Sequence, residues 1–513
     1  MVGVDQAVTS RQSISGDSPQ FRTLLNYAQP INRLPPEILS AIFRLVVGPV
    51  RATRLRDVLR LSSICHNWRV IILGDGVMWS GICVIGQDPM FIAQQLARCR
   101  GAPLYLFLSV PDAVFPVEQV SPLSRFSQAA QMIQTRRSQV RSISAKVGSC
   151  RAFKRVFGFD WPNLEGLTWI DACPPESRMH EQNPPLPEEH HRTPKLRYLS
   201  AKRGLPWEIT GTTSLTTLKL EGPMDIDILK FLQVNPHLES LELTKLRVQP
   251  PPANVTSIEL PNTIKVVMHD VEYAQLFACV TFPSLRYLTV DPIDRRQQPV
   301  EIALSQLQVL PTVTKLKIEY LPHMQHERIS IAGLDRTNTT LFNLTERTRF
   351  GGGTPAIQAL CRTSLPSVTS LSIGGGIPGF WFSLPSTAIC TLISGLPRLQ
   401  RLDLFPHRLS LTIMQHLRSY QHVCPELKIL SIALVRSTCE EMFRLLSGFV
   451  SDRARSGQWV HRVDCVILKV PGEVYQHAKR TWESLSRGCR FEEYLRCGCS
   501  GEVRQAEIQP CFQ

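Results

Sequence analysis

Lysine is scarce in this chain of 513 residues, because only 13 of its 57 cationic side chains are lysine. None occurs before Lys146, and none lies between Lys317 and Lys428. The formal net charge of +14 is therefore carried mainly by arginine, and it is spread along the chain without basic runs. Such a charge suits acidic partners or nucleic acid, but the excess is diffuse, so a solvated surface is the preferred interpretation and nucleic acid is not expected as a ligand.

Long apolar runs and paired cysteines are also missing. No run reaches the roughly 18–20 residues that span a bilayer, and MVGVDQAVTS at the start lacks the pattern of a secretory signal. The 15 cysteines are odd in number and show no paired spacing, which predicts reduced thiols instead of a disulfide framework. These features together predict an intracellular protein, cytoplasmic or nuclear, with no membrane partner.

The chain has no signature of enzyme chemistry such as Gly-x-Ser-x-Gly, His-Glu-x-x-His or a Walker motif. A glycine loop at Gly374, Gly376 and Gly379 follows a strand pattern and resembles a dinucleotide fingerprint. However, Pro378 and Gly379 fall where a binding helix would begin, so a loop between repeats is the preferred interpretation. We therefore expect no catalytic residue and no cofactor, and an enzyme that uses these glycines is the weakest alternative.

Cysteine and histidine clusters lack the spacing of a metal centre. The tail cysteines at 489, 497, 499 and 511 include one Cys-x-Cys, whereas zinc sites favour two Cys-x-x-Cys or His pairs. The run Glu188–His191 lies in a proline-rich stretch, where adjacent loop residues do not form a ligand set. The sequence predicts free thiols and a solvated linker, with no metal.

A short pattern recurs after residue 84: often a proline, then x-Leu-x-x-Leu-x-Leu, as in PHLESLEL at 236–243. Its leading apolar positions are Leu164, Leu196, Leu215, Leu238, Leu285, Val313, Val368, Leu399 and Leu427. Most of them are 19–32 residues apart, and the 55-residue gap after Val313 is expected to hide a degenerate copy near Leu341 and Leu344. Such self-similarity is typical of a solenoid.

The repeats predict an α/β fold with parallel strands on one face and helices on the other. The Leu-x-Leu alternation gives one short strand in each repeat, and helical stretches lie between the strands. For example, Ser386 can cap a helix that runs to about Ser394, and Gly395 can end it. The predicted organisation is a tail at 1–30, a small all-α module at 31–84, an irregular leucine-rich-repeat solenoid at 85–488 with a proline-rich insertion at 174–194, and a cysteine-containing tail at 489–513.

The sequence of the module at 31–84 predicts small helices. They carry more apolar side chains than such helices can bury against one another. Pro36 suits a first helical turn, and a second helix is expected over 57–69. An exposed apolar face is then expected, and such faces usually meet a partner. The alternative is a cap that merely covers the first repeat.

This module resembles an F-box motif. The match rests on three elements: LPPEIL at the start, ICHNWR in the second half and the closing Met-Trp pair. The matching residues are Leu34, Pro35, Glu37, Ile38, Leu39, Ile64, Cys65, Trp68, Arg69, Met78 and Trp79. The whole chain, with its tail, F-box and irregular leucine-rich repeats, resembles the large F-box families of mushroom-forming (basidiomycete) fungi.

The resemblance implies a substrate receptor of a cullin-RING ubiquitin ligase. The F-box would dock on a Skp-type adaptor, and through it a cullin, while the repeats would hold an unknown target protein. The expected adaptor-facing residues are Leu34, Pro35, Ile38, Leu39, Ile42, Leu59, Ile64, Trp68 and Trp79, some of which must be internal core. The rival function is a non-ligase leucine-rich-repeat scaffold whose N-terminal helices only cap the solenoid.

A target surface is expected on the strand face, where outward residues alternate with core leucines. The candidate residues are Lys219, Glu239, Glu242, Lys315, Lys317, Arg401, Asp403 and Lys428. A merely solvated face is an equal alternative for this set. The two leading functions differ in one observation: whether the face that carries Leu34, Ile38 and Ile42 is open or covered by residues 85–160.

Overall fold

The computed structural model describes most of the chain between residues 26 and 506. The described ranges are 26–48, 53–84, 88–110, 121–148, 160–172, 193–204, 214–223, 227–246, 257–291, 300–307, 310–322, 327–348, 355–375, 386–404, 409–435, 439–458, 460–468, 493–496 and 503–506. They belong to two compact units, Met1–Asp225 and Ile226–Gln513, which are treated separately below. No helix in these ranges is long and apolar enough to cross a membrane.

The first unit begins with a group of short helices. They are η2 (Pro30–Arg33), α3 (Pro36–Val47), α4 (Arg54–Ser62), α5 (His66–Gly74) and η3 (Gly76–Trp79), followed by β1 (Gly81–Cys83) and α6 (Pro89–Arg98). Helix α3 begins at Pro36 as predicted, with Glu37 in its first turn, where a negative charge complements the helix dipole. The side chains of Leu39, Phe43 and Val47 are buried along its inner face.

The second predicted helix, over 57–69, is in fact two helices. Helix α4 ends at Ser62, and α5 starts after Cys65, whose backbone is extended (φ −154°, ψ 168°). The hydroxyl of Ser62 donates to the carbonyl of Leu59, and that of Ser63 donates to the carbonyl of Arg60. Serine competes for backbone groups in this way, so the Ser-Ser pair ends the helix where the apolar period alone predicted continuity.

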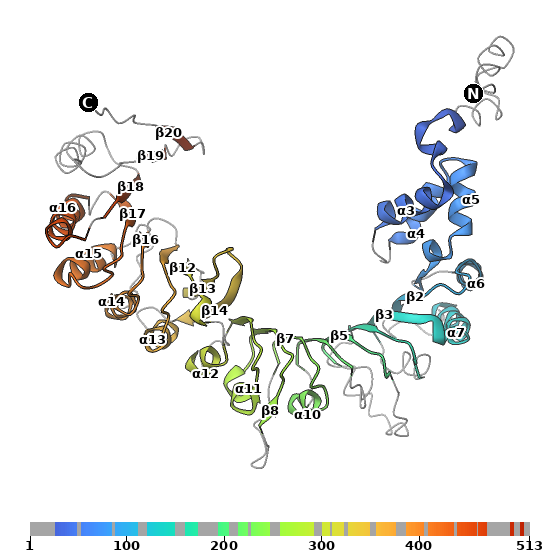
Figure 1. Ribbon diagram of the computed structural model, residues 1–513. Coiled ribbons are helices and arrows are strands. Elements are labelled where there is room, and N and C mark those ends of the chain that lie inside the picture. The colour runs from blue at the N-terminus through green and yellow to red at the C-terminus, as the bar shows by residue number, and fades with distance from the viewer. Residues whose placement is uncertain are drawn as a thin grey trace, which may run out of the picture. The chain divides into compact units, whose positions relative to one another are not determined.

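The strands of the first unit form a parallel sheet that follows the chain order. They are β1, β2 (Leu104–Val110), β3 (Val140–Val147), β4 (Gly166–Asp171), β5 (Tyr198–Lys202) and β6 (Thr217–Glu221), each paired in parallel with the next. Helices α6 and α7 (Ser121–Gln134) lie beside β2 and β3, and the short η4 (Arg137–Gln139) precedes β3 (Figure 1). Along β4 to β6, buried and half-exposed residues alternate, so one face of the sheet is core and the other is open.

Every leading apolar position of the sequence repeat lies just before a strand, at the same distance from it. Each of the nine is at most 2% exposed, and each lies two residues before its strand begins. A turn precedes most of them: for instance, the amide of Leu238 donates to the carbonyl of Asn235, and that of Leu399 to the carbonyl of Leu396. The strand positions predicted from the repeat are confirmed.

The second unit alternates strands and helices. Its helical elements are α10 (Ile228–Gln233), α11 (Tyr273–Cys279), α12 (Val300–Ser305), η5 (Leu310–Thr312), α13 (Pro355–Arg362), α14 (Ser386–Ser394), α15 (Leu409–Ser419) and α16 (Cys439–Arg455). Its strands are β7 (Ser240–Thr244), β8 (Ile258–Glu259), β9 (Lys265–His269), β10 (Val280–Thr281), β11 (Tyr287–Asp291), β12 (Lys315–Pro322), β13 (Glu327–Leu334), β14 (Thr340–Thr348), β15 (Ser370–Gly375), β16 (Arg401–Leu404), β17 (Ile429–Val435), β18 (Arg462–Leu468), β19 (Glu493–Arg496) and β20 (Val503–Ala506). Helix α14 has the bounds expected from Ser386 and Gly395.

The gap after Val313 holds both an antiparallel insertion and the expected strand near Leu341 and Leu344, which is β14 and is followed by α13. Strand β13 pairs antiparallel with both β12 and β14, while β14 also pairs in parallel with β11. The β13–β14 turn is closed by Asp335, whose carboxylate accepts the amides of Thr337 and Thr339, and by Asn338 with φ 65°. Asp and Asn are the residues that favour such a turn, so DRTNTT at 335–340 was the overlooked signal.

Glu346 of β14 carries a carboxyl group whose pKa is raised by burial to about 7, although it accepts the amide of Ala356 at 3.1 Å. The folded chain thus binds this proton more tightly than the unfolded chain. The contribution of the protonated Glu346 carboxyl to the stability of the fold is complete below pH 4.5. It is lost as the pH rises to about 7.

We therefore expect Glu346→Gln, which keeps an acceptor for Ala356 but has no charge, to stabilise the second unit at pH 8 by up to about 3 kcal/mol and to have little effect at pH 4. Thermal unfolding at both pH values measures the difference. The control is Glu319→Gln on β12, at a partly exposed carboxylate. Equal effects of Glu346→Gln at the two pH values would contradict this account.

Candidate functional site

Helix α3 presents an apolar stripe to solvent. Ile38 is 49% exposed, Leu45 81% and Val46 63%, and Ile42 lies half-buried between them at helical spacing. Leu34, just before the helix, is 37% exposed. Large apolar side chains gathered on one helix stripe are unusual for a surface that meets only water.

The neighbouring helices also expose apolar side chains. Leu59 on α4 is 42% exposed and Ile64, between α4 and α5, is 56% exposed. Helix α3 packs against both α4 and α5. We call Leu34, Pro35, Ile38, Ile42, Leu45, Val46, Leu59 and Ile64 the open apolar set, since none of these side chains is buried.

The structure sorts the nine predicted adaptor-facing residues. Leu34, Pro35, Ile38, Leu59 and Ile64 are exposed, and Ile42 and Trp68 are half-buried. Leu39 and Trp79 are 0% and 1% exposed, so they belong to the core and offer no surface to a partner. Sequence reasoning missed Leu45 and Val46, although their spacing from Ile38 was a usable signal.

Trp68 holds the start of the module in place. Its ring contacts that of Phe43 with centroids 4.6 Å apart, and its Nε1–H donates to Oδ1 of Asn32 at 2.6 Å. The Asn32 amide in turn donates to the carbonyl of Asn26. These contacts fix the segment that leads into Leu34, so Trp68 acts here as a positioning residue.

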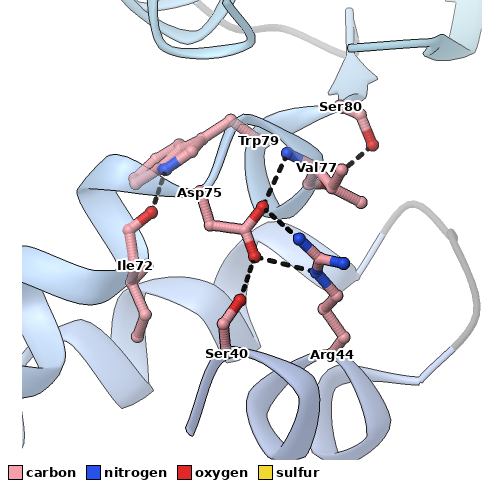
Figure 2. A network of polar contacts seen from close by, with 7 residues as sticks. All are labelled: Ser40, Arg44, Ile72, Asp75, Val77, Trp79 and Ser80. Carbon is pink, nitrogen blue, oxygen red and sulfur yellow. Dashed lines mark hydrogen bonds and ion pairs between the residues drawn. The ribbon is translucent and has the colours of Figure 1, made fainter. Parts of the chain in front are cut away.

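Asp75 forms the polar centre of the module (Figure 2). Its carboxylate accepts from the Ser40 hydroxyl at 2.5 Å, from Arg44 Nε at 2.8 Å and Nη2 at 3.0 Å, and from the Val77 amide at 3.0 Å. Burial alone would raise the pKa of this carboxyl, but the hydrogen bonds from Arg44 and Ser40 outweigh it, and the pKa is lowered. The carboxylate therefore links Ser40 and Arg44 of α3 to the first turn of η3.

The end of the module packs against the end of α6. The Trp79 indole donates to the carbonyl of Ile72 at 2.9 Å, the Cys99 thiol donates to the carbonyl of Trp79, and Arg98 lies over the Trp79 ring at 4.5 Å. Burial raises the pKa of the Cys99 thiol to about 11, so it stays a neutral donor. At Gly76 a Cβ would lie 2.3 Å from the Cys99 carbonyl oxygen, so only glycine fits this approach.

The two sides of the module therefore have different surroundings. The module contacts the end of α6 through Trp79 and β2 through Ser80, as a cap would, whereas Leu34 before α3 and Ile38 on α3 are open. The observation that separates the two leading functions thus favours a module with a free binding face. A pure cap would have no reason to leave this stripe exposed.

The eight predicted target-facing residues all lie outside the core. Several carry charges that are already balanced nearby: Lys317 pairs with Glu319 at 2.6 Å, and Arg401 with Asp403 at 2.9 Å, each two residues apart on one strand. Exposed pairs of this kind contribute little to stability and leave little net charge for a partner.

The discounted motifs fall largely outside the described residues. Gly376 and Gly379, the run Glu188–His191 and the four tail cysteines lie there. Within the described ranges, no group of three or more His, Cys, Asp or Glu side chains could hold a metal ion.

Comparison with known proteins agrees with the module's sequence and geometry. The family described as F-box-like matches residues 31–85. No curated protein matches the chain. Residues 31–85 are thus an F-box-like domain.

Proposed function

We propose that this chain is the substrate-recognition subunit of a Skp/cullin/F-box-type ubiquitin ligase. The F-box-like match at 31–85 supports the role, because F-box domains generally bind Skp-type adaptors. The observation that carries the proposal is the exposure of the open apolar set, above all Ile38 at 49% and Leu45 at 81%. The proposed complex buries this set against the adaptor and links the chain to a cullin.

The strand-helix units after the module are proposed to form a leucine-rich-repeat-like solenoid that recognises a target protein. The nine buried leading positions, each two residues before a strand, support this architecture. In this role the chain performs no chemistry of its own. It raises the effective concentration of target lysines near a ubiquitin-conjugating enzyme.

Affinity capture of the tagged full chain tests the proposal. A Skp-type adaptor in near-stoichiometric amount, together with a cullin, is the expected eluate. An adaptor signal no higher than that of an unrelated tagged protein of similar charge would rule the proposal out.

A non-ligase scaffold is the second candidate, and the contacts of Trp79 with the end of α6 favour it. In that case the open apolar set would serve no partner of its own. Capture of other proteins without adaptor or cullin would then be the result.

A further inference from the structure

One face of the sheet of the first unit is open. Three outward residues from each of the strands β2 to β6 make up this face, and none of them is buried: Tyr105, Phe107, Ser109, Ser142, Ser144, Lys146, Gly166, Thr168, Ile170, Tyr198, Ser200, Lys202, Thr217, Lys219 and Glu221. We call this the lysine-aromatic face. Its middle is lined by small hydroxyl residues that pair in register, Ser144 with Thr168 and Thr168 with Ser200.

Apolar side chains flank this polar middle. Tyr105 and Phe107 lie half-buried on β2, at one edge of the face. Ile170 on β4 and Tyr198 on β5 are each 37% exposed. Small polar side chains therefore lie between larger apolar ones on this face.

Two lysines lie near the carboxyl ends of these strands. Lys146 on β3 and Lys202 on β5 share one register row with Ile170 between them, and Lys219 lies on β6. Glu221, which pairs with Lys202 at 2.5 Å, is the one carboxylate on this face, and among the described residues Lys146 has no ion-pair partner. The residues of this face thus include three lysines and one glutamate, and Lys146 is the exposed one of the three lysines.

We infer that the lysine-aromatic face binds a segment of the target protein that is rich in aspartate and glutamate and carries an apolar side chain. The inference rests on the proposed function and names the partner class of its recognition domain. Charge complementarity selects the carboxylates, and Ile170 and Tyr198 supply apolar contact. A nucleic acid fits less well, because phosphate recognition favours the fork of arginine, and the cations on this face are lysines beside a glutamate.

The test is selection of a phage-displayed library of random peptides, about a dozen residues long, on the full chain. The best synthetic peptide is then titrated against Lys146→Glu/Lys202→Glu and against the control Lys265→Glu/Lys428→Glu, which makes the same change of net charge in the second unit. We expect selected peptides enriched in Asp and Glu, roughly tenfold weaker binding by the first variant, and less than about twofold change in the control. If the double variant does not fold, Lys146→Gln replaces it in the titration. A smaller loss of peptide affinity is then expected.

Three results would overturn the inference: selected peptides without acidic enrichment, equal loss in both double variants, or displacement of the peptide by a single-stranded RNA oligomer of equal charge. Adaptor capture by the same variants separates this inference from the proposed function. We expect it to be unchanged, because Lys146 and Lys202 lie outside residues 31–85. Loss of peptide binding with normal adaptor capture supports the inference, whereas failure of the unmodified chain to capture adaptor counts against the proposed function alone.

Discussion

Ile38→Asp is expected to abolish capture of the Skp-type adaptor while the chain stays folded. Ile38 is 49% exposed on α3, so the substitution places a charge on the open apolar set without disturbing the core. Anchors at the centre of an interface commonly contribute about 2 kcal/mol or more, which corresponds to at least a roughly 30-fold loss of affinity. The combined change of Leu34 and Pro35 to alanine is expected to have a similar effect. Titration of purified chain with purified adaptor gives the affinities.

Ile264→Asp is the matched control for this experiment. Ile264 is 46% exposed but lies in the second unit, so its replacement makes the same chemical change away from the module. Its adaptor affinity should equal that of the unmodified chain. If Ile38→Asp also bound adaptor normally, this face of α3 would not be the docking surface.

Asp75→Ala is expected to destabilise the F-box-like module by about 2–4 kcal/mol. The substitution leaves Ser40, Arg44 and the Val77 amide without their shared acceptor, and removing one partner of a buried charged network costs more than the network contributes. Arg44 is about half exposed, which keeps the expected value below that of a fully buried pair. Pulse proteolysis in urea, read as cleavage within residues 36–79, measures the loss.

Asp88→Ala provides the comparison for Asp75→Ala. Asp88 caps α6 by accepting the Met90 amide, just as Asp75 accepts that of Val77, but it is exposed, and among the described residues it has no arginine partner like Arg44. Loss of a cap alone costs about 1 kcal/mol. Equal destabilisation by the two substitutions would mean that Ser40 and Arg44 contribute nothing.

The pH dependence of the module should follow Asp75. The pKa of this carboxyl is lower in the folded chain than in the unfolded chain, so its contribution is fully present above the ordinary value of 3.8. It is lost as the pH falls through the lower, folded value. Acid unfolding of the module should therefore shift to higher pH in Asp75→Ala.

The strand positions could be predicted because the repeat encodes them locally. A buried residue such as Leu238 follows a proline-containing turn and starts a strand two residues later, and this arrangement recurs at Leu399. The turn and the alternation of buried and outward residues both lie within the eight residues of one repeat pattern. No long-range information is needed to place such a strand.

The binding face could be predicted only in part. Ile38 and Leu39 are adjacent and equally apolar, and only the packing of α3 on α4 and α5 decides that Leu39 is core while Ile38 is open. Trp79 was misassigned for the same reason, since its burial depends on Cys99 and Arg98, far along the chain. Asp75 gave no periodic signal at all, because its partners lie 31 and 35 residues away.

Amide hydrogen exchange of the full chain, with and without purified Skp-type adaptor, tests the central claim most directly. The account predicts added protection in α3 and α4, which carry Ile38, Leu45 and Leu59, and none in the strands of the second unit. Protection confined to the second unit, or no change anywhere, would contradict the claim that the open apolar set is the adaptor's docking surface.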